Sequence, residues 1–151
     1  MGENHLTGGC QCGAVRYRFD APPRDANICH CRMCQKATGS PFGAFAALAR
    51  DELIFTRGAP KFYQSSAIAE RGFCADCGTP LTYRGLNSAR VSVTICSLDA
   101  PDAVAPQSQL DADNAVAWLR ACLTTPNTHI ADWLKAKQIA DIGSRQHPDH
   151  E

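Results

Sequence analysis

Three cysteines lie close together in the segment CHCRMCQKATGS (29–40), namely Cys29, Cys31 and Cys34. Clustered thiolates are typical metal ligands, and zinc readily accepts a tetrahedral set of sulfur atoms. A closed structural zinc site takes four protein ligands, whereas a catalytic site takes three and leaves one position open. An iron–sulfur cluster would also usually require four cysteines. The trio therefore indicates either an incomplete structural site or a deliberately open one.

Two further cysteine pairs lie far apart along the chain, Cys10 and Cys12 in GGCQCG and Cys74 and Cys77 in FCADCGTPL. On an extended chain, side chains two residues apart point to the same face, with Cα atoms roughly 6.5–7 Å apart. A Cys-x-x-Cys turn likewise brings its two thiolates together. We predict that these four cysteines form one closed structural zinc site. A redox pair is the alternative, but the βαβ context of such a motif is missing.

The other candidate ligands are interpreted as structural residues. We expect Cys96 to be a small buried side chain in a strand, although it could complete the trio, and Cys122 to pack among apolar neighbours. His30 lies between two cysteines of the trio and should point away from them if the segment is extended. We therefore interpret it as a surface histidine or as one that lies behind the ligands. His147 and His150 are expected to belong to a frayed tail.

The elements that must position these residues read mainly as short strands. Val15, Tyr17 and Phe19 alternate with polar residues in 13–20, and Val91, Val93 and Ile95 do so in 90–97, which is the period of a half-buried strand. Gly and Pro separate further β-leaning segments at 42–49, 52–56, 61–65 and 80–84. Residues 97–114 read as irregular.

A helix is predicted near the C-terminus, at about 126–142, with Thr125 as N-cap and Pro126 at its first position. Ile130, Trp133 and Leu134 fall on one face, and we expect this face to pack on the sheet. We predict one domain over residues 1–151, with a core at about 6–120 and a polar tail at 143–151.

Composition excludes several classes of partner. The 151 residues contain 15 Lys and Arg against 15 Asp and Glu, without a basic cluster, which argues against nucleic acid or an anionic membrane as a partner. No apolar run approaches the roughly 20 residues that span a bilayer. The N-terminus does not read as a secretory signal, so we expect a cytoplasmic protein. In a reducing compartment, its nine cysteines are better explained as metal ligands than as disulfides.

The cysteine pattern resembles the glutathione-dependent formaldehyde-activating enzyme family, which also includes centromere protein V. The resemblance rests on Gly-x-Cys-x-Cys-Gly, Cys-His-Cys-x-x-Cys and Phe-Cys-x-x-Cys-Gly-x-x-Leu in this order over residues 8–100. Supporting matches are Lys36–Ser40, Phe42–Phe45, Ser97-Leu98-Asp99 and Trp118-Leu119. The chain departs from the pattern at Gln109-Leu110, where many relatives have His-Ile, and the helix after Pro126 reads as an addition.

The resemblance implies a mainly β, tent-like arrangement of short antiparallel sheets around two zinc ions. It assigns Cys10, Cys12, Cys74 and Cys77 to a structural zinc, in agreement with the spacing, and Cys29, Cys31 and Cys34 to a catalytic zinc. It also implies a carbon–sulfur lyase that condenses glutathione with formaldehyde. The expected partners are thus a small thiol and an aldehyde, and homo-oligomerisation is left open.

Several roles around such a site stay as hypotheses. His30 is a candidate general acid because histidine side chains ordinarily titrate close to physiological pH. Lys36 and Arg32 are candidates for binding the carboxylates of glutathione, although a solvated surface charge is the preferred interpretation of each. The alternative functions are a zinc-stabilised binding module without turnover and a sensor of metal or thiol stress, with the trio as its reactive element.

Overall fold

The computed structural model describes residues 5–150, and strands dominate it. In chain order the strands are β1 (Leu6–Gly9), β2 (Arg16–Phe19), β3 (Asp25–Cys29), β4 (Gly43–Ala49), β5 (Ile54–Arg57), β6 (Lys61–Ser66), β7 (Ala69–Phe73), β8 (Pro80–Gly85), β9 (Arg90–Thr94) and β10 (Ser108–Leu110). The helices are α1 (Arg32–Thr38), α2 (Leu119–Cys122) and α3 (Ile130–Ala136).

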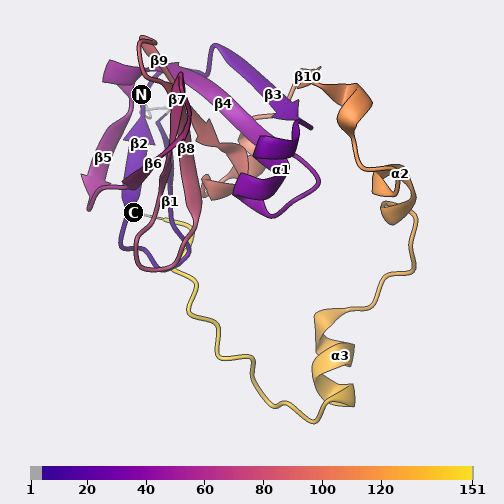
Figure 1. Ribbon diagram of the computed structural model, residues 1–151. Coiled ribbons are helices and arrows are strands. Elements are labelled where there is room, and N and C mark those ends of the chain that lie inside the picture. Colours follow the sequence, from indigo (N-terminus) through magenta and orange to yellow (C-terminus); the bar gives the residue numbers. More distant parts are fainter. Residues whose placement is uncertain (1–4, 151) are drawn as a thin grey trace.

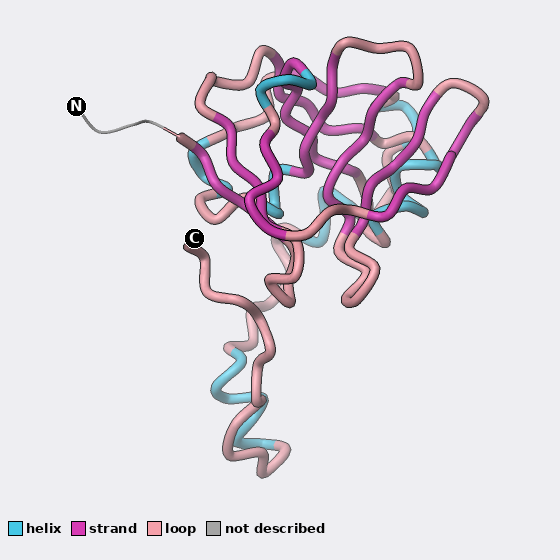
Figure 2. The backbone as a smooth tube through the Cα atoms, turned by 90° about the vertical axis from the view of Figure 1, so that its left-hand side faces the viewer, coloured by secondary structure: helices cyan, strands magenta, loops and turns pink. Residues whose placement is uncertain are grey.

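The strands form two sheets (Figures 1 and 2). A small sheet has the order β1-β2-β5, and a large sheet has the order β10-β3-β4-β9-β8-β7-β6. Every strand pair is antiparallel except β10 with β3, which is parallel. The prediction of a mainly β fold built from short antiparallel sheets is therefore confirmed.

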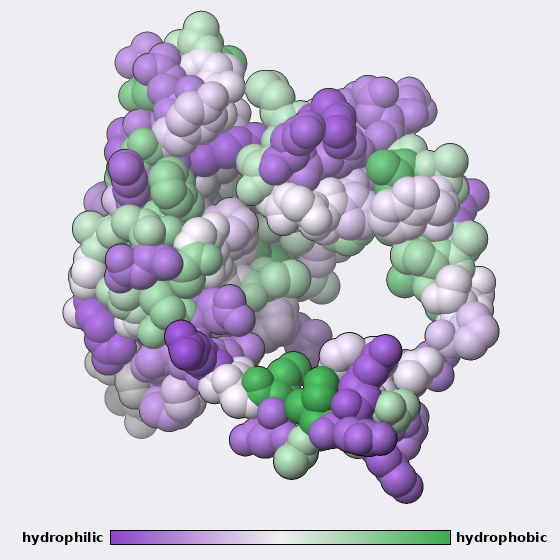
Figure 3. Space-filling view, turned by 60° about the horizontal axis from the view of Figure 1, so that its bottom comes forward, coloured by the Kyte–Doolittle hydropathy of each residue, from purple (hydrophilic) through white to green (hydrophobic). Residues whose placement is uncertain are grey.

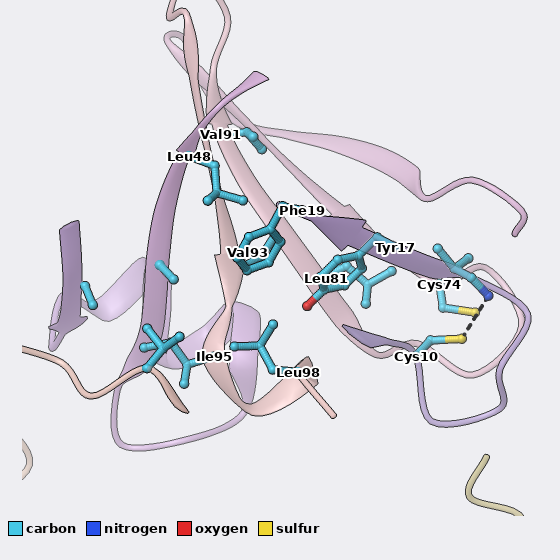
Figure 4. Close-up of a cluster of buried hydrophobic side chains, with 14 residues drawn as sticks. Cys10, Tyr17, Phe19, Leu48, Cys74, Leu81, Val91, Val93, Ile95 and Leu98 are labelled. Carbon is cyan, nitrogen blue, oxygen red and sulfur yellow. Dashed lines mark hydrogen bonds between the residues drawn. The ribbon is translucent and has the colours of Figure 1, made fainter. Parts of the chain in front are cut away.

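The core lies between the two sheets, as Figure 4 shows. Tyr17 and Phe19 of β2 are completely buried, and they belong to one cluster with Leu48 of β4, Leu81 of β8 and Val93 of β9. Burying side chains of this size contributes about 1.5–3 kcal/mol each. Period-2 alternation in β2 and β9 thus identified the strand faces that build the core. Cys10 and Cys74 lie at one end of the same cluster.

The opposite face of the large sheet carries a row of polar and aromatic side chains. The strand register places Tyr63 of β6 beside Arg71 of β7, Arg71 beside Tyr83 of β8, and Tyr83 beside Ser92 of β9. Cross-strand partners share a face of the sheet, so these four side chains lie on one side. Helix α1 contacts β4 of the same sheet. This outer face holds the candidate functional site.

One charged residue of β2 departs from the simple alternation. Arg16 was expected on the solvent side of its strand, but only 2% of it is exposed. Its guanidinium donates to both carboxylate oxygens of Asp99, at 2.9 and 2.5 Å, and Thr7 also donates to Asp99. Although burial raises the pKa of Asp99, the bonds from Arg16 and Thr7 lower it more, to below its ordinary range. The ion pair fastens the small sheet to the segment after β9.

Four strands were not predicted: β1, β3, β7 and β10. Glycine occupies half of β1, and β7 contains Glu70, Arg71 and Gly72, so neither shows the apolar alternation of a half-buried strand. Residues 97–114 were expected to be irregular, yet they contain β10 and short 3-10 turns. Strand β10 is exposed along its whole length, and its hydrogen bonds to β3 rather than its side chains define it.

The C-terminal prediction was partly wrong. Helix α3 covers only Ile130–Ala136, with His129 rather than Thr125 as its N-cap. Its expected packing on the sheet is absent: Ile130 is 64% and Trp133 45% exposed. Residues 115–150 form an extension that stands off from the sheets, and its apolar side chains are partly visible at the surface in Figure 3. None of the described residues in this extension is buried.

The tail after α3 is less free than expected. The backbone N–H of His147 donates to the carbonyl of Gln11 at 2.7 Å, and its ring lies 3.3 Å from an Arg57 nitrogen. The chain end therefore returns to the loop after β1. Within the described residues, no helix combines the length and apolar composition needed to cross a bilayer. The predicted single domain over 1–151 remains a prediction, and residues 1–4 and 151 lie outside the described part.

Candidate functional site

Two similar turns present the first cysteine cluster. Cys10 and Cys12 follow β1, where the N–H of Gly13 donates to the carbonyl of Cys10 at 3.0 Å. Cys74 and Cys77 follow β7, where the N–H of Gly78 donates to the carbonyl of Cys74 at 2.9 Å. Both glycines have positive φ angles, of 77° and 78°, which glycine adopts at little cost. The expected extended geometry around Cys10 was therefore wrong, although the predicted convergence of the two sulfurs is correct.

The four sulfur atoms of this cluster match a tetrahedral zinc site. They all lie within 4.8 Å of one another. The Sγ atoms of Cys10 and Cys12 are 3.5 Å apart, and those of Cys12 and Cys74 are 3.8 Å apart. A tetrahedron with Zn–S bonds of about 2.3 Å has sulfur–sulfur edges of about 3.8 Å. Sequence reasoning placed these four cysteines together, and the geometry suits a metal ion.

Thr79 favours the thiolate form of one member of this cluster. Burial raises the pKa of the Cys77 thiol, but hydrogen bonds from the hydroxyl and N–H of Thr79 lower it to about 6. The Thr79 hydroxyl lies 3.1 Å from the Cys77 sulfur. Because metal ligation requires deprotonated cysteine, this environment prepares Cys77 for a cation.

The second cluster is built at the junction of β3 and α1. Cys29 ends β3, Cys31 is the N-cap of α1, and Cys34 lies in the first turn of that helix. Their three sulfur atoms lie within 4.8 Å of one another. The N–H of Cys34 donates to the Cys31 sulfur at 3.4 Å. Burial raises the pKa of Cys31, but backbone hydrogen bonds from Cys34 and Met33 contribute to a pKa below its ordinary value. Three convergent sulfurs fit the donor set of a zinc site with one open position.

The trio borders open space. Cys29, Cys31 and Cys34 all line a cavity of about 190 Å³ on the outer face of the large sheet. Tyr83, Ser92 and Arg71 line the same cavity. No fourth cysteine, histidine or carboxylate of the described chain joins this cluster. A ligand from solution therefore has a route to the three sulfurs.

Arg71 is the functional candidate that sequence reasoning missed. One guanidinium nitrogen lies 3.4 Å from the Cys34 sulfur, and the guanidinium carbon lies 5.0 Å from the centre of the Tyr83 ring. Because Arg71 lies in a strand without apolar alternation, nothing in the neighbouring sequence indicates that it belongs to a site. Only the pairing of β7 with β8 brings it to the trio. It supplies a fixed positive charge beside a group of thiolates.

His30 is not placed as a general acid. Only 1% of it is exposed, so the interpretation as a surface residue was wrong. Its Nε2 atom lies 3.0 Å from the Gln109 side-chain oxygen, and its ring contacts Phe42 edge-on at 5.7 Å. The backbone carbonyl of His30 also accepts a 2.8 Å hydrogen bond from Gln35. His30 thus supports the loop that carries the cysteines, and it does not line the cavity beside them.

The remaining candidates separate clearly. Lys36 lines a larger cleft that adjoins the trio cavity. Arg32 instead donates to the Gln35 side chain at 3.2 Å and lines neither of these two spaces. Cys96 and Cys122 are both exposed, so the predictions that they are buried or packed were wrong. Cys96 falls in a turn after β9 rather than in the strand, which removes it from the alternating pattern.

The fold and site define a β protein with two cysteine clusters that could hold metal ions, one of four cysteines and one of three. Residues 5–113 match the model of the glutathione-dependent formaldehyde-activating enzyme family, and the chain belongs to this family. The extension formed by residues 115–150 lies outside the matched region.

Individual relatives agree with this membership. The chain is 28% identical to an "uncharacterized lyase" of Schizosaccharomyces pombe over 111 residues, which cover 63% of this chain and 80% of that protein. It is 33% identical over 84 residues to a Halomonas elongata protein named "putative glutathione-dependent formaldehyde-activating enzyme", covering 50% of this chain and 54% of that one. A crystal structure of a Rhodobacter sphaeroides protein superposes with a TM-score of 0.56 at 25% identity, covering 68% and 98% of the two chains.

Proposed function

We propose that the protein is a zinc-dependent enzyme of the carbon–sulfur lyase type, which forms or cleaves the S-hydroxymethyl adduct of glutathione and an aldehyde such as formaldehyde. The observation that carries this proposal is the contrast between the clusters. Four sulfurs surround one position at the end of the core, whereas three sulfurs border a cavity. Family membership and the names of the relatives support the choice of thiol and aldehyde.

Each cluster then has its own role. Cys10, Cys12, Cys74 and Cys77 would hold a structural zinc ion, and Cys29, Cys31 and Cys34 would hold a catalytic one. When bound at the trio, zinc would lower the pKa of a substrate thiol and favour its thiolate form. Arg71 offsets part of the negative charge that the cysteine thiolates concentrate beside the cavity.

Cations of the chain position the thiol substrate. Arg71 directs one nitrogen at Cys34, and its guanidinium has further donors suited to a carboxylate of glutathione. Lys36 offers a second cation in the adjoining cleft. The lining of the two spaces contains no Asp or Glu, so the cysteine thiolates are the negatively charged groups that a carboxylate of glutathione meets there.

The reaction is an addition without redox change. The thiol sulfur forms a bond to the aldehyde carbon, the carbonyl π bond breaks, and the thiol proton ends on the new hydroxyl oxygen. Cleavage is the reverse. Neither space is lined by a carboxylic acid or an imidazole, and in this proposal water carries the proton between sulfur and oxygen.

Exchange measurements test this proposal. Glutathione and formaldehyde also combine spontaneously, so NMR exchange spectroscopy should compare adduct interconversion with and without the zinc-loaded protein. We expect at least about a tenfold acceleration, because a polarised thiol adds faster than a neutral one. The Cys29→Ser variant should give the spontaneous rate. An unchanged rate with the zinc-loaded wild type would exclude the proposed activity on this pair.

A further inference from the structure

A second, larger space adjoins the cavity of the cysteine trio. This cleft has a volume of about 490 Å³, whereas the trio cavity has about 190 Å³. Cavities in the range of about 300–1,000 Å³ bind organic molecules of substantial size. Formaldehyde fills only a small fraction of such a volume. The proposed reaction with formaldehyde uses the Lys36 side chain of the cleft but leaves its apolar walls without a role.

The cleft and the trio cavity share part of their lining. Four residues line both spaces: Met33, Phe45, Ser65 and Arg71. Met33 belongs to the helix that carries Cys34, and Arg71 contacts the Cys34 sulfur. A substituent on a carbon atom that is bonded to a thiol at the trio therefore lies beside residues that also line the cleft.

The two spaces differ in chemistry. The trio cavity carries side-chain amide and hydroxyl groups from Asn27, Ser65, Ser66 and Ser92, in addition to Arg71. These groups suit the polar backbone of a peptide thiol. The walls of the cleft are mainly apolar, with the side chains of Met33, Ala37, Phe45, Tyr63, Phe73 and Pro80. An apolar substituent gains free energy by leaving water for such walls.

The cleft contains a buried hydroxyl group that could bind a ligand. Thr82 is only 5% exposed and lines the cleft. Its Oγ1 atom has no hydrogen-bond partner among the described residues. Buried polar groups normally have a partner, so this hydroxyl is suited to a polar atom of a bound molecule. The cleft thus offers apolar contact together with one directed hydrogen bond.

We propose that the cleft binds the organic substituent of an aldehyde larger than formaldehyde, so that the enzyme forms or cleaves hemithioacetals of glutathione with alkyl or aromatic aldehydes. This inference rests on the proposed function and names its substrate class. The step stays balanced: the sulfur bonds to the carbonyl carbon, the π bond breaks, and the thiol proton moves to the oxygen. The substituent takes no part in the chemistry and supplies binding energy.

Binding of stable analogues tests the cleft without turnover. Isothermal titration of the zinc-loaded protein should compare S-hexylglutathione with S-methylglutathione. Each methylene group that enters an apolar cleft strengthens binding by about fourfold. We expect the hexyl compound to bind at least about tenfold more tightly, since only part of the chain has to be buried. Equal affinities would overturn the inference.

A cleft-filling variant shows where the preference arises. Ala37 lies on α1 and lines the cleft, so Ala37→Trp should fill it and abolish the preference for the hexyl compound. Ala136→Trp on the exposed helix α3 is the matched control and should keep the preference. A preference that survives Ala37→Trp would place the hexyl group elsewhere and contradict the assignment.

Rates with two aldehydes separate this inference from the proposed function. The acceleration over the spontaneous reaction should be larger for hexanal than for formaldehyde, and Ala37→Trp should reduce the acceleration of hexanal. Acceleration with formaldehyde but not with hexanal would overturn the cleft assignment and leave the proposed function standing. A lack of acceleration with every aldehyde would remove the proposed function, and with it the assignment of the cleft.

Discussion

At the scale of single residues, the cysteines were predictable and their neighbours were not. Seven cysteines could be sorted into a group of four and a group of three, because short spacing brings sulfur atoms together in almost any local backbone. Arg71 became a candidate only when strand pairing placed it beside Cys34. For His30 the error was the opposite one: it was a candidate general acid in the sequence, but its ring bonds to Gln109 and supports the loop.

Arg71 gives a prediction at this scale. In the proposed function its guanidinium binds a carboxylate of glutathione, and a hydrogen bond to a charged group is worth about 1.5–3 kcal/mol. Arg71→Met should therefore raise the KM for glutathione about tenfold or more. Steady-state kinetics over a range of glutathione concentrations would measure this change.

The matched control is Arg32→Met on helix α1, because Arg32 lines neither the cleft nor the trio cavity. It should leave the KM for glutathione near the wild-type value. Metal analysis should find the same zinc content in both variants. If Arg71→Met kept a normal KM, the carboxylate role of Arg71 would be rejected.

At the scale of elements, the regular strands could be predicted and the connecting ones could not. Alternation located β2 and β9 because one face of each is buried in the core. Strands β7 and β10 hold their places through backbone pairing, which leaves little trace in side-chain pattern. The turn at Gly13 likewise replaced an expected extended segment around Cys10, whereas the turn at Gly78 was predicted.

The four-cysteine cluster links the loop after β1 with the turn between β7 and β8, so its metal should contribute to folding. Cys74→Ser should lower the melting temperature by more than about 10 °C, since loss of several kcal/mol shifts a domain of this size by that amount. Calorimetry would measure the change. Cys96→Ser, which alters an exposed cysteine outside both clusters, should melt near the wild-type temperature. Equal melting of the two variants would argue against a structural metal.

The ion pair of Arg16 and Asp99 predicts a pH dependence of stability. Because the pKa of Asp99 is depressed in the folded state, the pair stabilises the fold above the unfolded pKa of about 3.9. This contribution is lost as the pH falls through the lower, folded pKa of Asp99. Asp99→Asn leaves Arg16 buried without its counter-charge and should cost about 3–5 kcal/mol near neutral pH.

Denaturant unfolding of wild type and Asp99→Asn at a series of pH values would test this sign. The difference in unfolding free energy should be largest at neutral pH. It should shrink as the pH falls from about 4, the unfolded pKa, through the lower folded pKa at which the native aspartate becomes protonated. Loss of metal in acid affects both proteins and largely cancels in the difference. A difference that grew in acid would contradict the assigned role of the pair.

At the scale of the whole molecule, the two sheets form a body with a buried core, whereas the extension of residues 115–150 has no buried residue among those described. The family match ends at residue 113, and the described residues after 114 are all at least partly exposed. The helical face of Ile130, Trp133 and Leu134 was recognised in the sequence, but periodicity does not reveal which surface an apolar face meets. Its predicted packing on the sheet was wrong for this reason.

Removal of the extension should therefore change little in the body. A chain that ends at residue 114 loses the contacts of His147 with Gln11 and Arg57, but no buried side chain. Its unfolding free energy should fall by no more than about 2 kcal/mol, because two contacts are lost and a hydrogen bond contributes about 0.5–1.5 kcal/mol. Denaturant unfolding would measure it. A loss of several kcal/mol would mean that the extension stabilises the body.

The central claim is that Cys29, Cys31 and Cys34 hold a metal ion with one position open to a substrate thiol. Replacement of zinc by cobalt makes this directly visible, because thiolate ligands give cobalt strong charge-transfer absorption. We predict two metal ions per chain in the wild type and one in Cys29→Ser. Glutathione should increase the absorption of the wild type alone, by the contribution of one additional sulfur ligand. The claim would be contradicted if two cobalt ions bound but glutathione left the absorption unchanged. It would also be contradicted if glutathione increased the absorption of Cys29→Ser equally.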